Sequence, residues 1–405
     1  MMNFIRISWR NLWRNPRRTL ITASSVFFGV IFAITYTSVQ EGSFGNMIDN
    51  IVRFHTGYLN IKQKDFRKTR SLNDSFIITP GLDSLLQQPE ITQIAGRIES
   101  FALASSGGNT FPALVIGIEP EKEESFSHVS KWITDGHFLT SGSKGAVLGE
   151  DLATNLHLTV GDTLILISQG YRGTSSAGIF PVSGIAHFPT PDLNKQLIYL
   201  DLQTCQSFFN APKLVTSMVI MVRNHNAVDP VFAKIQPHLP KNLSLYTWSD
   251  LNKGLVEFIE GKKAAGKVVS GLLFMIIAFG ILSTLIMLVD ERMREMGIMM
   301  ALGMRRMRLS LMIFTETLLM GLVGVFIGFA VMFPIIHRFV SHPVALTGSM
   351  RDTFTQMGFE PVIIFSEQFR IFLDPALVVF YIMLFLSLYI FYAVFRIKET
   401  KAINE

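Results

Sequence analysis

Residues 290–304 read Asp-Glu-Arg-Met-Arg-Glu-Met-Gly-Ile-Met-Met-Ala-Leu-Gly-Met and lie directly between two long apolar runs. From Arg294 to Leu302, only Gly297 favours a turn, so the segment is predicted to be a short charged helix and not a loose linker. Held at a membrane surface, such a helix can receive a force from a partner and pass it to both neighbouring spans. The segment therefore predicts a transducer and not an enzyme.

The composition outside this segment indicates a membrane protein with one large polar domain. Only 17% of the 405 residues are charged, against about 25% in a typical soluble protein. Residues 40–267 contain 20 Lys and Arg against 21 Asp and Glu, so the large domain is neutral and nucleic acid is not an expected partner. The single cysteine, Cys205, allows neither an internal disulfide nor a cysteine-based metal site.

Four apolar segments are long enough to cross the roughly 30 Å of bilayer hydrocarbon. They are residues 20–39, 268–289, 309–336 and 376–395. The first is too long for a signal peptide, and Gln40-Glu41-Gly42 offers no small-residue cleavage site. The predicted fold is an α-helical membrane protein with four transmembrane helices and a large α+β extracytoplasmic domain, residues 40–267, between the first two.

Lys and Arg set the expected orientation, because cytoplasmic loops carry an excess of both. Five arginines lie in residues 1–19, five in residues 290–308, and three basic residues in residues 396–405. The 337–375 loop has three over a greater length. We expect a protein of the bacterial inner membrane with both termini and residues 290–308 in the cytoplasm. Residues 40–267 and the 337–375 loop are expected in the periplasm.

Residues 1–19 are predicted to form an amphipathic helix in the membrane interface, ending near Asn15-Pro16. Apolar residues recur every four positions beside a stripe of arginines: Ile5, Trp9 and Trp13 beside Arg6, Arg10 and Arg14. Two interpretations stay open. The helix is a simple anchor, or it is an elbow that moves with the first span.

The third span contains an acid and three glycines. Glu316 lies about 12 Å from Leu309 at 1.5 Å per residue, a depth at which an acid must be paired or hydrated. It is either a coupling residue or a structural partner for Thr315, Thr317 or the arginines below, and the structural role is favoured. Gly321, Gly324 and Gly328 are predicted to let another helix approach closely. Pro334 is expected to kink or end the helix.

The large domain is predicted to mix short strands with helices, in two lobes. Strands are expected at residues 57–61, 113–118, 145–149, 163–168, 179–185, 197–200 and 218–222. Helices are expected at residues 150–157, 228–238 and 251–267, the last running into the second span.

Motifs for catalysis, cofactors and metals are not convincing in this sequence. Residues 261–268 fit G-x-x-x-x-G-K, but Val268 stands where a phosphate-binding loop carries Ser or Thr, and the stretch is predicted to be helical. The nine histidines show no metal-binding spacing. The acidic run from Glu119 to Glu124 is expected to be a solvated turn. We therefore expect no catalytic residue, bound cofactor or metal in this chain.

Several motifs together resemble the FtsX-like permease subunits of bacterial ABC transporters. Residues 291–304 followed by Glu316 are similar to the family's coupling-helix motif and its following glutamate. Residues 9–18, Trp-Arg-Asn-Leu-Trp-Arg-Asn-Pro-Arg-Arg, are similar to its N-terminal elbow. Val147-Leu-Gly-Glu-Asp-Leu-Ala153 with Val160-Gly-Asp162 is similar to its outer-domain signature. The tail, Lys401-Ala-Ile-Asn404, departs from the family's Pro-x-x-Ala-Leu ending.

Within that family, residues 42–61, ending in His55-Thr-Gly-Tyr-Leu-Asn-Ile61, are most similar to lipoprotein-releasing permeases of the LolC and LolE group. The resemblance implies release of lipoproteins from the inner membrane toward the outer membrane. The implied partners are ABC ATPase subunits, a second permease that is a copy or a paralogue, the lipoprotein, a periplasmic carrier and membrane lipid. The ATPase would use ATP and Mg, and this chain would bind neither.

The resemblance also implies roles for residues. The implied ATPase-coupling residues are Glu291, Arg294, Glu295, Gly297, Ala301, Leu302 and Gly303. Met47 and Ile48 are candidate substrate-proximal residues, because they are apolar and follow the first span. Two other functions stay open: a macrolide or peptide exporter with a periplasmic adaptor, and an FtsX-type regulator of a cell-wall hydrolase.

Overall fold

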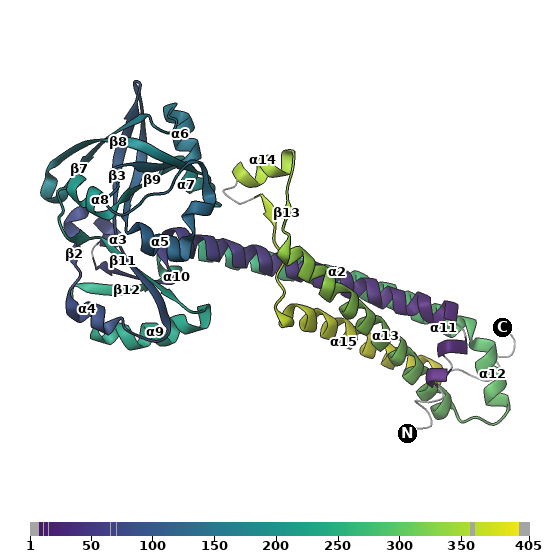
Figure 1. The fold of residues 1–405 in the computed structure, drawn as a ribbon. Coiled ribbons are helices and arrows are strands. Elements are labelled where there is room, and N and C mark those ends of the chain that lie inside the picture. Colours follow the sequence, from purple (N-terminus) through teal and green to yellow (C-terminus); the bar gives the residue numbers. More distant parts are fainter. Residues whose placement is uncertain are drawn as a thin grey trace. The chain divides into compact units, whose positions relative to one another are not determined.

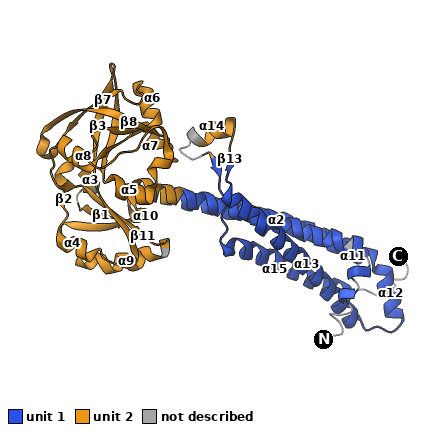
Figure 2. Cartoon of the chain, in the orientation of Figure 1, with its two compact units in different colours: residues 1–46, 258–345, 362–405 blue, residues 47–257, 346–361 orange. Residues whose placement is uncertain are grey.

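A computed structural model describes residues 8–10, 12–14, 16–64, 66–69, 71–356 and 361–396. The chain divides into two compact units, coloured blue and orange in Figure 2. Unit 1 consists of residues 1–46, 258–345 and 362–405, and unit 2 consists of residues 47–257 and 346–361. The predicted tail motif at residues 401–404 and the elbow residues Ile5 and Arg6 lie outside the described residues.

Four long helices make up most of what the structure describes of unit 1 (Figure 1). The long helices are α2 (Pro16–Ile51), α11 (Lys253–Glu291), α13 (Arg306–Ser341) and α15 (Phe369–Phe395). Among the described residues, four helices are long and apolar enough to cross a membrane, which confirms the predicted number. Each is longer than the apolar run that predicted it, because polar residues continue the helix beyond that run.

The core of unit 1 contains side chains from every long helix. Val26 of α2, Leu285 of α11, Ile313 of α13 and Val379 of α15 are all buried in one cluster. Lipid tails are as apolar as these side chains, so close packing and not the hydrophobic effect must hold such helices together. Large apolar side chains on the outside, such as Phe326 with 73% exposed, suit contact with lipid.

The chain between the last two spans differs from a plain loop. Pro334 lies inside α13, which continues to Ser341, so the proline does not end the helix. Loss of one backbone hydrogen bond at proline is tolerated in membrane helices, where neighbouring groups satisfy the freed carbonyl. The segment that follows contains β13 (Val344–Ala345), α14 (Ser349–Gln356) and β14 (Val362–Ile363).

Unit 2 is a mixed α/β domain, as predicted, and its strands lie between α2 and α11 in the chain. Its sheet has ten strands in the order β12-β1-β11-β3-β4-β9-β6-β8-β5, with β7 paired to β3 and β8. The strands are β1 (Leu59–Gln63), β3 (Ile91–Ser106), β4 (Asn109–Ile118), β5 (Ile133–Gly136), β6 (Ala146–Gly149), β7 (Thr163–Gln169), β8 (Ser175–Ala186), β9 (Leu197–Asp201), β11 (Ser217–Val222) and β12 (Leu243–Thr247). A separate pair joins β2 (Phe76–Ile77) to β10 (Leu214–Val215). All seven predicted strands overlap strands of the structure.

Short helices cover this sheet. They are α3 (Phe66–Thr69), α4 (Pro80–Leu85), α5 (Pro120–Ser127), α6 (Glu150–Leu156), α7 (Pro191–Gln196), α8 (Leu202–Phe208), α9 (Val228–Ile235) and α10 (Trp248–Leu251). Short 3-10 turns supplement them at Leu72–Asp74, Val129–Trp132, Tyr171–Gly173, His225–Ala227 and Gln236–His238. The end of α2 continues into a π-helical turn, η1 (Val52–Thr56).

The longest strand, β3, joins two lobes, and the sequence did not predict it. Its first half pairs with β11 and its second half with β4. One core surrounds Leu59, Ile220 and Val231, and another surrounds Ile98 and Leu148. Residues of β3 border both cores, so the two lobes share this strand and are connected through it.

Charged side chains are buried where β3 passes from one lobe to the other. Arg97 is fully buried, and its Nη2 lies 2.5 Å from Oε1 of Glu123. Its Nη1 donates to the backbone oxygen of His55 at 2.6 Å. Glu123 of α5 belongs to the acidic run expected in a solvated turn, so that expectation is wrong for this residue, which Arg97 holds inside the domain.

A second buried ion pair lies two residues along β3. Nζ of Lys62 donates to Oε2 of Glu99 at 2.9 Å. Burial alone would raise the pKa of Glu99, but Lys62, with His55 and Ser217, lowers it to about 2. Burial would likewise lower the pKa of Arg97, but Glu123 beside it raises that pKa above its ordinary value. The Lys62–Glu99 pair is therefore ionic at neutral pH, whereas burial raises the pKa of Glu123 above its ordinary value although Arg97 lies beside it.

Candidate coupling site

The charged segment between the second and third spans forms a short helix, α12 (Met293–Ala301), between α11 and α13. The helical path breaks at Arg292, whose φ of −102° and ψ of 3° differ from those of the helices. At the other end, Gly303 has φ +94°, a conformation that glycine adopts without strain. The Gly303 amide donates to Met300 O and the Met304 amide to Met299 O, the bond pattern of a Schellman ending. Glycine at 303 therefore ends α12 sharply.

One face of α12 is fixed to unit 1. Met296, Gly297 and Met300 are buried, and both methionines pack in the same cluster as Leu309 and Ile313 of α13. Gly297 was predicted to contact an ATPase with its neighbours. In the structure, Gly297 lies on the packed face of α12, away from the exposed residues predicted to contact the ATPase.

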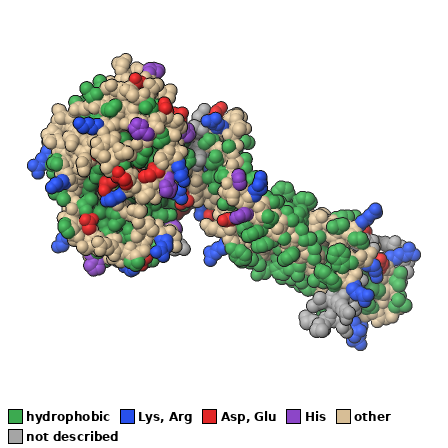
Figure 3. All heavy atoms as spheres, in the orientation of Figure 1, with side chains coloured by type: hydrophobic (Ala, Val, Ile, Leu, Met, Phe, Trp, Pro, Cys, Tyr) green, Lys and Arg blue, Asp and Glu red, His purple; other side chains and the backbone are tan. Residues whose placement is uncertain are grey.

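The other face of α12 and the residues beside it are exposed. Of the predicted coupling residues, those at the surface are Glu291, Arg294, Glu295, Ala301, Leu302 and Gly303. Leu302 is 83% exposed and Ile298 is 54% exposed. Arginines flank this surface, and Figure 3 shows Lys and Arg gathered at the end of the helical unit that carries α12. Exposed large apolar side chains within a charged rim are typical of a protein-binding surface.

Glu316 is buried in α13 and paired with an arginine. Its Oε2 accepts a hydrogen bond from Nη1 of Arg292 at 2.5 Å. Arg292 is only 5% exposed and Glu316 is 0% exposed. The pair ties the corner between α11 and α12 to α13. Of the partners considered from the sequence, the structure therefore selects an arginine.

The threonines beside Glu316 have other partners. Thr315 shares a hydrogen bond of 2.7 Å with Ser8, and Thr317 donates to Phe314 O at 3.0 Å. Among the described residues, neither Oε1 of Glu316 nor Nε of Arg292 has a hydrogen-bond partner. The contact between Nη1 of Arg292 and Oε2 of Glu316 is therefore the main stabilisation of these two buried charges.

The N-terminal segment contacts the same region through the residues that the structure describes. Residues 8–10 and 12–14 are helical, and Leu12 is buried against Leu288 and Met320. Trp9 and Trp13 are 46% and 67% exposed. Nη2 of Arg14 lies 3.8 Å from Oε2 of Glu295 on α12. Both side chains are exposed, so this pair adds little stability.

The three glycines of α13 lie where other helices pass closely. A Cβ on Gly324 would lie 2.6 Å from the backbone oxygen of Ala23 on α2, and one on Gly328 would lie 3.0 Å from Val30. A Cβ on Gly321 would lie 2.5 Å from the side chain of Met383 on α15. α13 therefore packs between α2 and α15 through positions that only glycine fits without a shift.

The other predicted positions lie apart from this site. Met47 and Ile48 are half-buried residues of α2 in unit 2. Ile48 packs against the cluster that contains Val52 and Trp248, which favours a structural role. Residues 261–268 lie inside α11, and not in the strand-to-helix loop that a phosphate site requires.

Arg292, the partner of Glu316, is the residue of this site that the sequence did not single out. It was one of five arginines in residues 290–308, which served to predict the orientation and were offered only as a group as partners for Glu316. The signal was available, because an acid inside a membrane span needs a cation. Which arginine supplies it depends on the helix break at residue 292, and that break was not predicted.

Comparisons with known proteins agree with this architecture. Residues 19–238 match the family described as MacB-like periplasmic core domain, and residues 267–399 match the family described as FtsX-like permease C-terminal. The chain is similar to the lipoprotein-releasing system transmembrane protein LolC of Xylella fastidiosa, with 24% identity over 252 residues, 60% of each chain. It is also similar to the macrolide export ATP-binding/permease protein MacB of Brucella abortus, with 21% identity over 341 residues, 80% of this chain and 51% of that protein.

A solved structure, the periplasmic region of MacB from Actinobacillus actinomycetemcomitans, covers 51% of this chain and 95% of that one, with 15% identity and a TM-score of 0.36. The chain spans 60% and 51% of the length of the two curated relatives named above.

Proposed function

Because the chain belongs to the family of FtsX-like permeases that carry a MacB-like periplasmic core domain, we propose that it couples ATP hydrolysis by a separate ATPase to work done in the periplasm. The observation that carries the proposal is α12. One face of this helix is packed onto the spans, and the other presents Leu302 and charged residues to a partner. The ATPase subunits, and not this chain, would bind ATP and Mg.

The proposed contact with the ATPase uses the exposed side of α12. It consists of Glu291, Arg294, Glu295, Ala301, Leu302 and Gly303. Gly297 supports the helix from behind, since it is buried. A push on α12 would reach α11 through the corner at Arg292 and α13 through Glu316. The ion pair would make the three elements move together.

The proposed orientation places α12 and both termini in the cytoplasm and unit 2 in the periplasm. Arginines near α12 and before α2 support it, because such residues stay on the cytoplasmic side. The family description of residues 19–238 as a periplasmic core domain supports it independently. Function would require a second permease, either a copy of this chain or a paralogue.

The proposed substrate is a lipoprotein, taken from the inner membrane and passed to a periplasmic carrier. Similarity to LolC supports this substrate, as does the resemblance of residues 42–61 to that group. Extraction needs an energy source, since each buried methylene is worth about 0.8 kcal/mol and an acyl anchor contains dozens. Coupling to an ATPase would supply that energy.

Purification of the tagged chain in mild detergent, followed by mass spectrometry of its bound proteins and lipids, tests this proposal. We expect an ABC ATPase subunit together with acylated lipoproteins. The same sample would show whether a second, different permease is present. An ATPase accompanied by a periplasmic adaptor or a cell-wall hydrolase, with no acylated cargo, would contradict lipoprotein release.

Export of a macrolide or peptide is the second candidate function. The alignment with the macrolide export protein MacB covers 80% of this chain, more than the alignment with LolC covers. A periplasmic adaptor bound to unit 2 would favour this function over lipoprotein release.

A further inference from the structure

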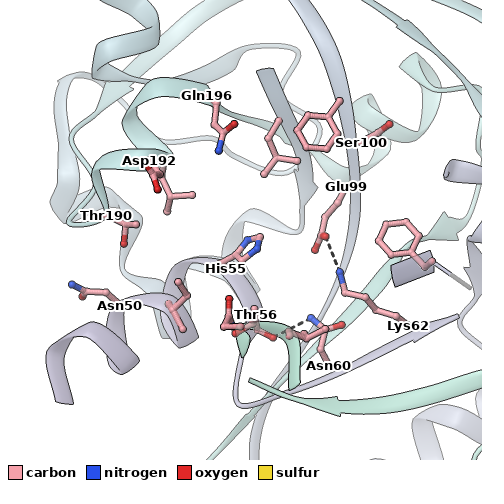
Figure 4. A pocket seen from close by; sticks show the side chains of 17 residues that line it. Asn50, His55, Thr56, Asn60, Lys62, Glu99, Ser100, Thr190, Asp192 and Gln196 are labelled. Atoms are coloured by element: carbon pink, nitrogen blue, oxygen red, sulfur yellow. Dashed lines mark hydrogen bonds and ion pairs between the residues drawn. The ribbon is translucent and has the colours of Figure 1, made fainter. Parts of the chain in front are cut away.

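Unit 2 encloses a cavity of about 500 Å³ that neither the coupling site nor the proposed transport cycle uses (Figure 4). Cavities of this size are typical of small-molecule sites. In Figure 4, Thr190, Asp192 and Gln196 line one side, and Asn60, Lys62 and Glu99 line another. Both lobes of unit 2 therefore contribute to its walls.

Part of the cavity wall is polar and buried. Lys62 and Glu99 are each 8% exposed and form the ion pair described above. Asn60, 1% exposed, donates from Nδ2 to Thr56 O at 3.0 Å. Its Oδ1 has no hydrogen-bond partner among the described residues.

The charges around the cavity favour a cation. Lys62 is neutralised by Glu99. Asp192 is exposed and makes no ion pair with any described residue at the distances that define the other pairs. Glu99 and Asp192 are the carboxylates of this lining, and only Glu99 is paired with a described cation, so the space beside Asp192 favours a cationic ligand over a phosphate or carboxylate.

The remaining wall is apolar. Phe66, Phe101, Leu114 and Leu193 line it, and Phe101 is 46% exposed. A ligand that fits the whole cavity needs an apolar body as well as a polar group. An ammonium group is also attracted to the face of an aromatic ring.

We propose that this cavity binds an amine-bearing amphiphile, with the ammonium group toward Asp192 and the apolar body on Phe101 and Leu114. The site has a direct connection to the membrane helices. Asn50 and Ile51 at the end of α2, and Asn252 immediately before α11, also line it. The ligand would therefore contact both segments that join unit 2 to the spans. Its binding would change the conformational equilibrium of these segments.

Fluorescence titration of the full-length chain in lipid nanodiscs with dansylcadaverine tests the proposal. This probe carries a primary amine on an apolar body and brightens on leaving water. We expect saturable binding that weakens at least tenfold in Asp192→Asn. Asp229→Asn, the same change at an exposed position of α9 outside the cavity, should leave binding unchanged. An analogue with a carboxylate in place of the amine should bind at least tenfold more weakly.

A second variant separates the cavity from the lipid and the rest of the surface. Ser100 lines the cavity and is half-buried, so Ser100→Trp should fill it and remove the saturable component while partition into lipid remains. Equal affinity for the amine and the carboxylate probe would overturn the proposal. Unchanged binding in both Asp192→Asn and Ser100→Trp, or no saturable binding to the unaltered chain, would overturn it as well.

Discussion

Glu316→Gln is expected to uncouple ATP hydrolysis from transport while the chain still inserts and assembles with its partners. The substitution leaves Arg292 as a buried cation, 5% exposed, without the carboxylate that lies 2.5 Å from its Nη1. Removing one partner of a buried ion pair costs about 3–5 kcal/mol, enough to favour a conformation in which the corner at Arg292 leaves α13. Motion of α12 would then no longer move α13.

The measurement is ATPase activity and substrate release by the purified complex. We expect hydrolysis to continue and release to fall by a factor on the order of 100 or more, since each 1.4 kcal/mol corresponds to tenfold. Glu260→Gln, at an exposed position of α11, is the matched control and should behave as the unaltered chain. The exchanged pair, Arg292→Glu with Glu316→Arg, should recover part of the release. Normal release by Glu316→Gln would mean that the pair is not part of the coupling path.

Arg97→Met is expected to destabilise the middle of β3 by about 3–5 kcal/mol. The reason is electrostatic, because Glu123 is fully buried and would lose the guanidinium that lies 2.5 Å away. The backbone oxygen of His55 would lose its donor as well. Since β3 belongs to both lobes, this loss would weaken the connection between them.

Hydrogen–deuterium exchange of peptides from β3 measures this effect in the full-length chain, because amide protection reports local opening. Protection should fall by a factor on the order of 100 to 1,000. Adding Glu123→Leu to Arg97→Met should restore most of it, since replacing both charges by apolar groups is often nearly neutral. Lys122→Met, which removes a half-exposed cation, is the control. Unchanged protection in Arg97→Met would show that the pair does not hold β3.

The elements that the sequence predicted are those with local signals. Four spans follow from uninterrupted apolar runs, and β6 followed by α6 follows from a buried strand that ends at Gly149 before an acidic first turn. α12 was predicted from a run without turn residues between two spans. In each case, the residues that decide the structure lie within one element.

What the sequence could not predict depends on distant partners. β3 was missed because Gly96, Arg97 and Glu99 interrupt its apolar pattern, and these charges are tolerated only because Glu123 and Lys62 meet them. Those partners lie 26 and 37 residues away in the chain. A charged residue in a sequence is ordinarily interpreted as exposed, so the sequence did not predict the strand that joins the two lobes.

The candidate site shows the same division. The position of Glu316 within an apolar run was sufficient to predict that it needs a partner. The identity of the partner required the helix break at Arg292. The inward position of Gly297 required knowledge of which face of α12 packs on α13. Apolar residues lie on both sides of α12, with Met296 and Met300 on the packed face and Ile298 on the exposed one, so its orientation depends on packing.

Site-directed photo-crosslinking from position 302 tests the central claim most directly. Leu302 is 83% exposed beside α12, so a photoreactive residue there should be tolerated and should reach a docked partner. Phe385, which is 73% exposed on α15, is the control for lipid-facing positions. In native membranes, we predict an adduct with an ABC ATPase subunit from position 302 and none from position 385. Failure to capture an ATPase from position 302, or equal capture from both positions, would contradict the account of α12 as the coupling element.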